Sequence, residues 1–246
     1  MSGDIDPLIA NWPGKSPVAE GVRPHPAAYH MLDVAAVAEC LLAQETGLAP
    51  AVRAALALLV ALHDLGKIGE PFRAMLLHGT VQQHGRHWEA TERLLEHHDE
   101  LLQHLGGAAN QRLSLYTAVA GHHGKPPHRE GRAYDKLMQA CGAQALQDSQ
   151  ALVRAYAALW PDASLVGLDK RQWRALSWWL PGLTAAADWI GSNAEWFAPQ
   201  APDLPLDDYL ARARALARAA VQRAGLDAGA PSDARLFDFA PRPMQA

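Results

Sequence analysis

The stretch Ala61–Lys67, with the sequence ALHDLGK, decides the fold prediction. It ends an apolar run rich in alanine and leucine, residues 51–62, which predicts a buried helix. Gly66 supplies the flexible break just after that helix. His63 and Asp64 therefore stand side by side where a core helix ends, and polar side chains placed there need a partner. A divalent metal ion, which both imidazole and carboxylate ligate, and a hydrogen-bonding pair at the helix end are equally good interpretations of this dipeptide.

The composition is that of an ordinary globular protein. Of the 246 residues, 49% are hydrophobic and 20% are charged, and the length fits one large domain or two small ones. The net charge of -4 argues against a protein that holds nucleic acid by charge alone. The sequence shows neither a signal peptide nor an apolar run of about 18 residues, so we expect a cytoplasmic protein without membrane contact. The two cysteines are predicted to be core residues.

Helical periodicity recurs along the chain and predicts an all-α fold, an irregular bundle of helices. Residues 1–27 predict an extended lead-in, with Trp12 as a packing anchor. The arginines of the last predicted helix are interpreted as a solvated basic face in preference to a DNA contact. The predicted helices cover about residues 26–45, 50–62, 87–98, 111–120, 134–159, 168–179 and 211–224.

Further polar residues lie at or near the ends of other predicted helices. The pair His122-His123 stands between Gly121 and Gly124, which allow a ligand close approach. Asp188 lies in an apolar setting and is spaced to share a helix face with Ser192 and Glu195. Alone, Asp188 could equally be a helix cap or a salt-bridge residue. With His63 and Asp64, the candidate metal ligands are His30, His63, Asp64, His87, His122, His123 and Asp188.

Five histidines and two carboxylates could hold two divalent ions, with Asp64 as the bridging carboxylate. Two ions about 3.5–4 Å apart are a common arrangement for hydrolysis of phosphate esters. The nitrogen-rich ligand set suits Mn, Co, Ni, Fe or Zn better than Mg, which prefers oxygen. Asp64 and Lys67 are the candidate catalytic residues. Lys67 could neutralise a phosphate oxygen, or it could be a cation at a helix C-terminus, and the sequence favours neither interpretation.

The ordered set of these residues resembles a known family. His30, the HDLGK stretch from His63, His87, Gly121–Gly124 and the segment DWIGSN from Asp188 are similar to the HD nuclease domain of the CRISPR-associated type I helicase-nuclease. The opening segments WPGKS, from Trp12, and HMLDVA, from His30, also resemble that family. The resemblance covers roughly residues 12–200 and implies an irregular helical HD-domain fold.

The resemblance also implies a ligand set and a function. One metal would be held by His30, His63, Asp64 and Asp188. The second would be held by Asp64, His87, His122 and His123. His87 is preferred over the neighbouring His84, His97 and His98 because of the WEAT sequence that follows it. The implied activity is metal-dependent endo- and exonucleolytic cleavage of single-stranded DNA in CRISPR interference, together with a CRISPR RNA-guided surveillance complex.

The C-terminal segment from Leu236, LFDFAPRPMQ, resembles the junction at which that family's helicase begins. The chain contains no Walker-type phosphate-binding loop, so ATP hydrolysis is not encoded in it. We expect residues 1–230 to form the HD nuclease domain. Residues 231–246 would be a linker and the start of a helicase domain of the same polypeptide.

Two other functions remain open from the residues themselves. One is an HD phosphohydrolase acting on nucleotides or cyclic nucleotides. The other is an HD fold kept as a docking module without turnover, which loss of ligands would indicate. The residues alone support the class of metal-dependent phosphohydrolases, whereas the single-stranded substrate and the role in interference come from the resemblance.

Overall fold

The computed structural model describes residues 6–16, 22, 24–82, 84–127 and 131–227, the side chains of residues 131–134 excepted. This part of the chain is helical, apart from one isolated bridge between Pro13 and Pro26, and the all-α prediction is confirmed. The α-helices are α1 (Pro7–Ala10), α2 (Ala27–Ala43), α3 (Pro50–Ala61), α4 (Glu70–His78), α5 (His87–His97), α6 (Ala109–Ala120), α7 (Gly131–Cys141), α8 (Ala143–Leu159), α9 (Lys170–Gly191) and α10 (Leu206–Arg223); the 3₁₀ helices are η1 (Leu65–Lys67), η2 (Asp99–Leu105) and η3 (Gly121–His123).

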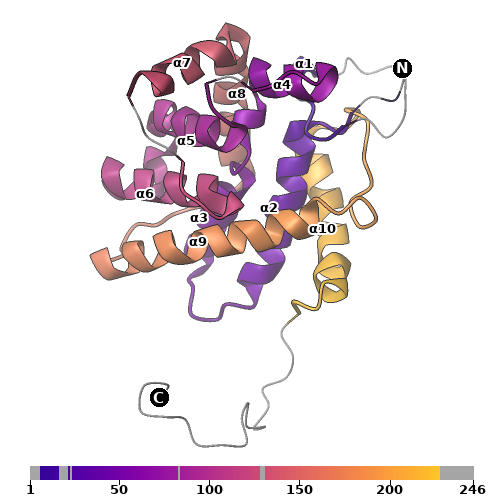
Figure 1. The fold of residues 1–246 in the computed structure, drawn as a ribbon. Helices are drawn as coiled ribbons and strands as arrows, with labels where there is room; N and C mark the ends of the chain where they lie inside the picture. Colours follow the sequence, from indigo (N-terminus) through magenta and orange to yellow (C-terminus); the bar gives the residue numbers. More distant parts are fainter. Residues whose placement is uncertain (1–5, 17–21, 23, 83, 128–130, 228–246) are drawn as a thin grey trace, which may run out of the picture.

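Helix α2 runs through the centre of the molecule. Every residue from Ala27 to Ala38 is buried, which is expected of a helix covered on all sides. Helix α9 crosses α2, and α10 packs along α2, while α5 and α6 lie together above the first half of α9 (Figure 1). The apolar run that ends at the HDLGK stretch forms α3, which also packs on α2.

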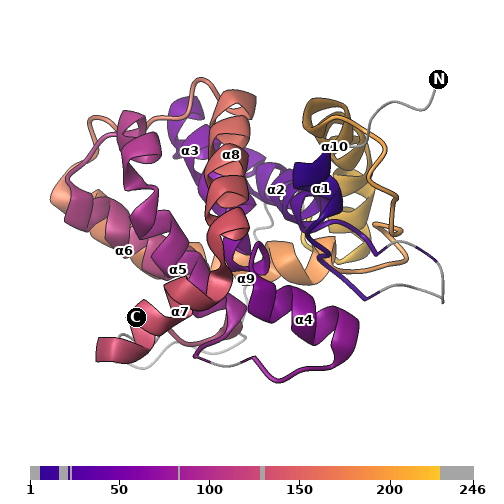
Figure 2. The same cartoon turned by 90° about the horizontal axis from the view of Figure 1, so that it is seen from above.

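Helix α8 closes the bundle on the side away from α9, between α3 and α7 (Figure 2). Trp12 is fully buried and its Nε1 donates a hydrogen bond of 2.7 Å to Asp148 Oδ2 of α8, so its predicted role as a packing anchor is confirmed. The guanidinium of Arg73 lies over the Trp12 ring, 4.8 Å from its centroid. The N-terminal segment is thereby fixed against the body of the fold.

Some details differ from the sequence-based prediction. The lead-in contains the short helix α1, and the stretch predicted as helical over residues 134–159 is two helices separated at Gly142. Helix α9 continues through Pro181 and ends at Gly191. Asp188 and the C-cap residue Ser192 share a face, as predicted, and are joined by a hydrogen bond of 2.9 Å, whereas Glu195 lies beyond the helix and its predicted place on that face is wrong. Cys141 is buried, as predicted, whereas Cys40 is half-buried.

In the described part of the chain, no helix combines the length and the apolar character needed to span a bilayer. The proposed helicase junction, residues 231–246, lies outside the described residues.

Candidate metal centre

All seven candidate ligands predicted from the sequence meet in one place, and most of them lie at helix ends. His30 lies in the first turn of α2, His87 is the first residue of α5, and Asp188 lies in the last turn of α9. The remaining four follow the C-termini of α3 and α6. Their nitrogen and oxygen atoms form two groups, each with its atoms within 4.8 Å of one another: His30, His63, Asp64 and Asp188, and Asp64, His87, His122 and His123.

The first set, which we call the buried group, surrounds one oxygen of Asp64. Asp64 Oδ2 lies 3.1 Å from His30 Nε2 and 3.3 Å from His63 Nε2. Asp188 Oδ1 faces the same two nitrogens, at 3.5 Å from that of His30 and 3.7 Å from that of His63. Only Asp188 among these four is more than marginally exposed, with 17% of its side chain accessible.

The second set, which we call the open group, surrounds the other oxygen of the same carboxylate. Asp64 Oδ1 lies 3.4 Å from His87 Nε2 and 3.7 Å from His122 Nε2. His123 completes the group from the solvent side, with its Nε2 3.2 Å from that of His87. Each oxygen of Asp64 therefore faces one group, which is the geometry that a bridging carboxylate requires.

The same kind of hydrogen bond to the backbone orients His63 and His122. Each histidine follows the end of a helix, and its Nδ1 donates to the carbonyl three residues earlier, at 2.9 Å for Val60 and 2.7 Å for Val119. This contact fixes the tautomer and leaves the Nε2 lone pair pointing into the centre. A backbone acceptor thus prepares one imidazole in each group for ligation.

Gly66 explains how the HDLGK stretch reaches α5. A Cβ atom on this residue would lie 1.9 Å from the carbonyl oxygen of His87, so any larger residue would push η1 and α5 apart. The amide of Gly66 also donates to Thr91 Oγ1 at 2.9 Å. This close approach holds His87 against Asp64.

Asp188 is held by the C-terminus of α9. Ser192 Oγ donates to Asp188 Oδ1 at 2.9 Å, and a Cβ on Gly191 would lie 3.0 Å from the backbone of Val34, so α9 ends directly against α2. Lys15 Nζ donates to the last carbonyls of the helix, at 3.3 Å to Gly191 and 3.2 Å to Ser192. A cation at this end also favours the helix dipole.

Lys15 was not among the residues predicted from the sequence to belong to the site. Its partners lie 176 and 177 positions away, so neither spacing nor helix periodicity could indicate the contact. The only signal was the WPGKS segment, which carried part of the resemblance without suggesting a role.

Lys67 points at the bridging carboxylate. Its Nζ lies 2.7 Å from Asp64 Oδ2 and 3.4 Å from the carbonyl oxygen of Gly14, and the side chain is nearly buried. The lysine thus reaches the centre, as one of the two interpretations of the sequence expected.

The electrostatics of the centre favour neutral imidazoles and ionised carboxylates. Burial lowers the pKa of His30 to about 3 and that of both His87 and His122 to about 4. Burial would raise the pKa of Asp64, but Lys67 and His63 together hold it well below its ordinary value. Asp64 and the three histidines His30, His87 and His122 are therefore in the protonation states in which they ligate metals.

The pKa of His63 reflects the negative charge of the buried group. Burial lowers its pKa, but the carboxylates of Asp64 and Asp188 together act more strongly and raise it to about 9. A proton on His63 therefore stabilises this pair of carboxylates. A divalent cation would supply the same positive charge in greater amount.

The centre also contains buried polar atoms without hydrogen-bond partners in the described part of the chain: His30 Nδ1, His63 Nε2, Asp64 Oδ1 and His122 Nε2. Leaving such atoms unpaired is unfavourable unless something else contacts them. Three of these atoms face the shared centre of the two groups. The donor set, its burial and its charge all fit divalent metal ions.

Comparison with known proteins gives a family. A model of the family described as "Cas3, HD domain" matches residues 12–197. The chain belongs to the Cas3 HD domain family. The family resemblance predicted from the sequence is thereby confirmed.

Three similar proteins place the Cas3 HD domain in context. The curated CRISPR-associated endonuclease/helicase Cas3 of Thermus thermophilus is 30% identical over 89% of this chain, and the chain spans 27% of that relative's length. A crystal structure of the Thermus thermophilus Cas3 HD domain in the presence of Ni²⁺ is 28% identical, with a TM-score of 0.63, over 82% of this chain and 85% of the other. The T. fusca Cas3 structure with AMPPNP, 20% identical, matches 90% of this chain and 28% of its own at a TM-score of 0.66, which supports the fold alone.

The histidines weighed against His87 lie elsewhere in the Cas3 HD fold. Among the described residues, His84, His97 and His98 belong to neither group. His98 is buried and its Nε2 lies 2.9 Å from Ser149 Oγ in the bundle. The geometry therefore supports the choice of His87, although its role as a ligand stays a prediction.

Proposed function

We propose that this chain is a metal-dependent nuclease that hydrolyses phosphodiester bonds of single-stranded DNA during CRISPR interference. The observation that carries the proposal is the division of Asp64 between two groups of ligands, one oxygen to each group. When two divalent ions are bound, they lower the pKa of water and supply positive charge to the phosphate. Membership in the Cas3 HD domain family supports DNA as the substrate over other phosphate esters.

The residues of the chain contribute orientation and charge to this reaction. His63 and His122 present their Nε2 atoms because their Nδ1 atoms are held by backbone carbonyls. Lys67 stabilises the ionised form of Asp64, and in the presence of substrate its ammonium is placed to neutralise a phosphate oxygen. The open group faces solvent through His123, so we assign the approach of substrate and water to that side.

The proposed metals are Mn, Co, Ni or Fe, with Mg less suitable, because imidazoles outnumber carboxylates three to one in the open group and equal them in the buried group. The presence of Ni²⁺ in the related Thermus thermophilus HD domain structure agrees with a divalent transition metal. We further propose that residues 1–230 are the nuclease domain, that residues 231–246 lead into a helicase domain of the same polypeptide, and that the protein acts in the cytoplasm with an RNA-guided surveillance complex.

The test is cleavage of circular single-stranded DNA by protein stripped of metal and then supplied with Mn, Co, Ni or Mg. Asp64→Asn keeps the shape of the shared ligand and removes its charge, and we expect it to abolish both cleavage and metal binding. Asp162→Asn removes an exposed carboxylate outside the centre and should behave as wild type. Mononucleotides and cyclic nucleotides are assayed in parallel, because hydrolysis of these without cutting of DNA would point to a nucleotide phosphohydrolase. Metal binding without any turnover would point to a docking module.

A further inference from the structure

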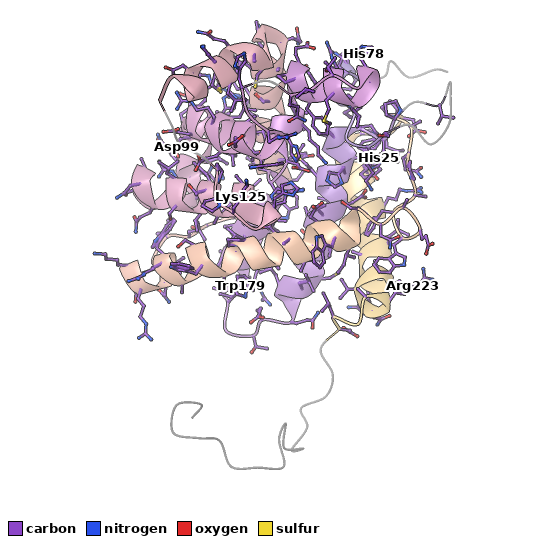
Figure 3. The ribbon with its side chains drawn as sticks, viewed as in Figure 1. His25, His78, Asp99, Lys125, Trp179 and Arg223 are labelled. Carbon is purple, nitrogen blue, oxygen red and sulfur yellow. The ribbon has the colours of Figure 1, made fainter. Side chains whose placement is uncertain are left out.

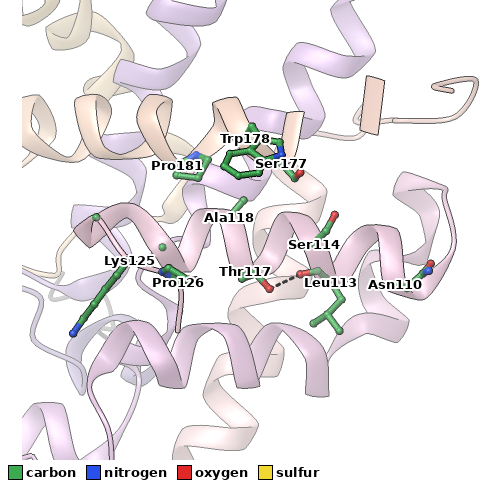
Figure 4. A pocket seen from close by; sticks show the side chains of 12 residues that line it. Asn110, Leu113, Ser114, Thr117, Ala118, Lys125, Pro126, Ser177, Trp178 and Pro181 are labelled. Carbon is green, nitrogen blue, oxygen red and sulfur yellow. Dashed lines mark hydrogen bonds between the residues drawn. The ribbon is translucent and has the colours of Figure 1, made fainter. Parts of the chain in front are cut away.

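A groove of about 870 Å³ runs between α6 and α9, outside the two metal-ligand groups (Figure 4). One wall is α6 and the other is the part of α9 around Trp178 and Pro181. No candidate metal ligand lines it. Its lining includes Asn110, Ser114, Gly121, Gly124, Lys125 and Trp178.

The groove extends to both ends of the segment that carries two ligands of the open group. Gly121 and Gly124, which line one end of it, flank His122 and His123 in the chain. Lys125 lies at the same end, and Figure 4 shows its side chain extending away from Trp178. In the whole molecule this lysine lies above the middle of α9 (Figure 3). The end of the groove at η3 is therefore formed by the residues that flank two ligands of the open group.

Trp178 gives the groove an exposed aromatic surface. Its side chain is 78% exposed, whereas tryptophan side chains are on average largely buried. Indole faces are good platforms for stacking nucleic-acid bases, and such stacking needs no particular base. A single-stranded segment offers bases for stacking, whereas the bases of a duplex are already stacked on one another.

Polar atoms along the walls suit base edges. Ser114 Oγ donates to the carbonyl of Gln111 at 2.6 Å and Ser177 Oγ donates to the carbonyl of Arg174 at 2.8 Å. Both hydroxyl oxygens keep lone pairs that can accept from the amino group of a base. Asn110, at the far end in Figure 4, can both donate and accept.

The charge of the groove differs from that of the whole chain. The protein carries a net charge of -4, yet the described lining residues include one lysine and no acidic residue. Arg174, one turn before Trp178 on α9, is exposed and adds a second cation next to the groove. Cations at both sides of an aromatic surface match a strand of bases linked by phosphates.

We propose that this groove holds the single-stranded DNA next to the cleavage site, with one base stacked on Trp178 and with Lys125 at a phosphate between that base and the open group. The inference rests on the proposed nuclease function and names where on the surface its substrate lies. A protein segment bound in the same groove is the alternative occupant, and it predicts that loss of Trp178 leaves oligonucleotide binding unchanged.

Trp189 supplies a matched control. It also lies on α9, eleven residues after Trp178, and is 81% exposed. It lines a different groove, of about 660 Å³, whose described lining contains no charged residue. Substitution of either tryptophan removes one exposed indole from the same helix, but only that of Trp178 removes it from the proposed path of the DNA.

The experiment measures binding of a fluorescently labelled oligodeoxythymidylate by anisotropy at low salt, with metal-free protein so that no cleavage interferes. We expect Trp178→Ala to raise Kd about tenfold, Trp178→Phe to restore most of the affinity, and Trp189→Ala to stay within twofold of wild type. Lys125→Gln should raise Kd and reduce its dependence on salt.

Equal effects of Trp178→Ala and Trp189→Ala, or no effect of either, would overturn the inference, as would absence of binding by the wild type. The two proposals fail separately. Wild-type protein that binds the oligonucleotide through Trp178 but cuts no DNA with any metal contradicts the nuclease function. Wild-type protein that cuts DNA with an affinity insensitive to Trp178 contradicts the groove as the path of the strand.

Discussion

The buried group and the open group use the same kinds of ligand in opposite surroundings. In the buried group, three of the four residues are buried, and the fourth, Asp188, accepts a hydrogen bond from Ser192. In the open group, His123 is exposed and its Nε2 lies 3.2 Å from that of His87. Because Asp64 belongs to both, the difference lies in what surrounds the other ligands. It suggests a division of work in which the buried group holds the shared carboxylate and the open group meets the substrate.

The largest expected effect tests the buried group. Asp188→Asn keeps the size of the side chain but removes one of the two carboxylates around His30 and His63. We expect the metal content to fall from two ions to one and cleavage to fall at least about a hundredfold, more than loss of an outer partner usually costs. Elemental analysis after dialysis and cleavage of single-stranded DNA measure the two effects. Glu195→Gln, an exposed neighbour outside both groups, should change neither quantity.

Lys15 tests whether the buried group depends on the end of α9. Lys15→Met keeps the packing of the stem but removes the donor to Gly191 and Ser192, so Asp188 loses part of its support. We expect the affinity of the buried group for metal to fall about 10–100-fold while the open group keeps its own. Competition with a chelator resolves two affinities in each protein. If both fell together, Lys15 would support the fold rather than Asp188, and partial recovery in Lys15→Arg would favour the specific role.

His123 tests the open group. His123→Ala removes its most exposed member and leaves Asp64, His87 and His122 in place. We expect roughly tenfold weaker metal binding in the open group, or about 1.4 kcal/mol, with the buried group unaffected. Chelator competition again separates the two groups. The exposed His78 lies outside both, so His78→Ala serves as the control for loss of a surface histidine. Loss of metal from the buried group in His123→Ala would show that the two groups do not act separately.

The smallest effect separates acid unfolding from metal release. His98 is buried away from both groups, and burial lowers its pKa to about 4 from an ordinary 6.5. The unfolded chain binds this proton more readily than the folded chain. The contribution of the neutral His98 to the free energy of unfolding is therefore fully present above pH 6.5 and is lost as the pH falls toward 4. The slope due to His98 is at most about 1.4 kcal/mol per pH unit.

Urea unfolding of metal-free protein between pH 4 and 7 measures that slope. His98→Gln can still donate to Ser149 and does not titrate, so we expect a shallower decline of the unfolding free energy. A decline as steep as that of wild type would assign the acid sensitivity to other groups, including those of the metal centre.

The sequence predicts the parts of this molecule that depend on local order. Helices α2, α3, α5 and α6 follow from periodicity, and the HDLGK turn follows from Gly66 after an apolar run. The seven candidate ligands were collected from their places at predicted helix ends, whereas their division into two groups was reached through the family resemblance. The contact of Lys15 with the end of α9 depends on tertiary packing, which no local pattern encodes, whereas Gly142, whose φ is +91°, is a local signal for the split of the 134–159 helix.

Helix α9 carries both Trp178 and Asp188, and this has a consequence for substrate length. The two residues are ten positions apart, which is about 15 Å along a helix. A stacked strand advances roughly 3.4 Å per nucleotide, so this distance corresponds to about four nucleotides. Dinucleotides and trinucleotides would occupy the metal centre without reaching the tryptophan, and longer strands would gain affinity from it. The rigid spacing of one helix would then set the shortest DNA that the enzyme binds well.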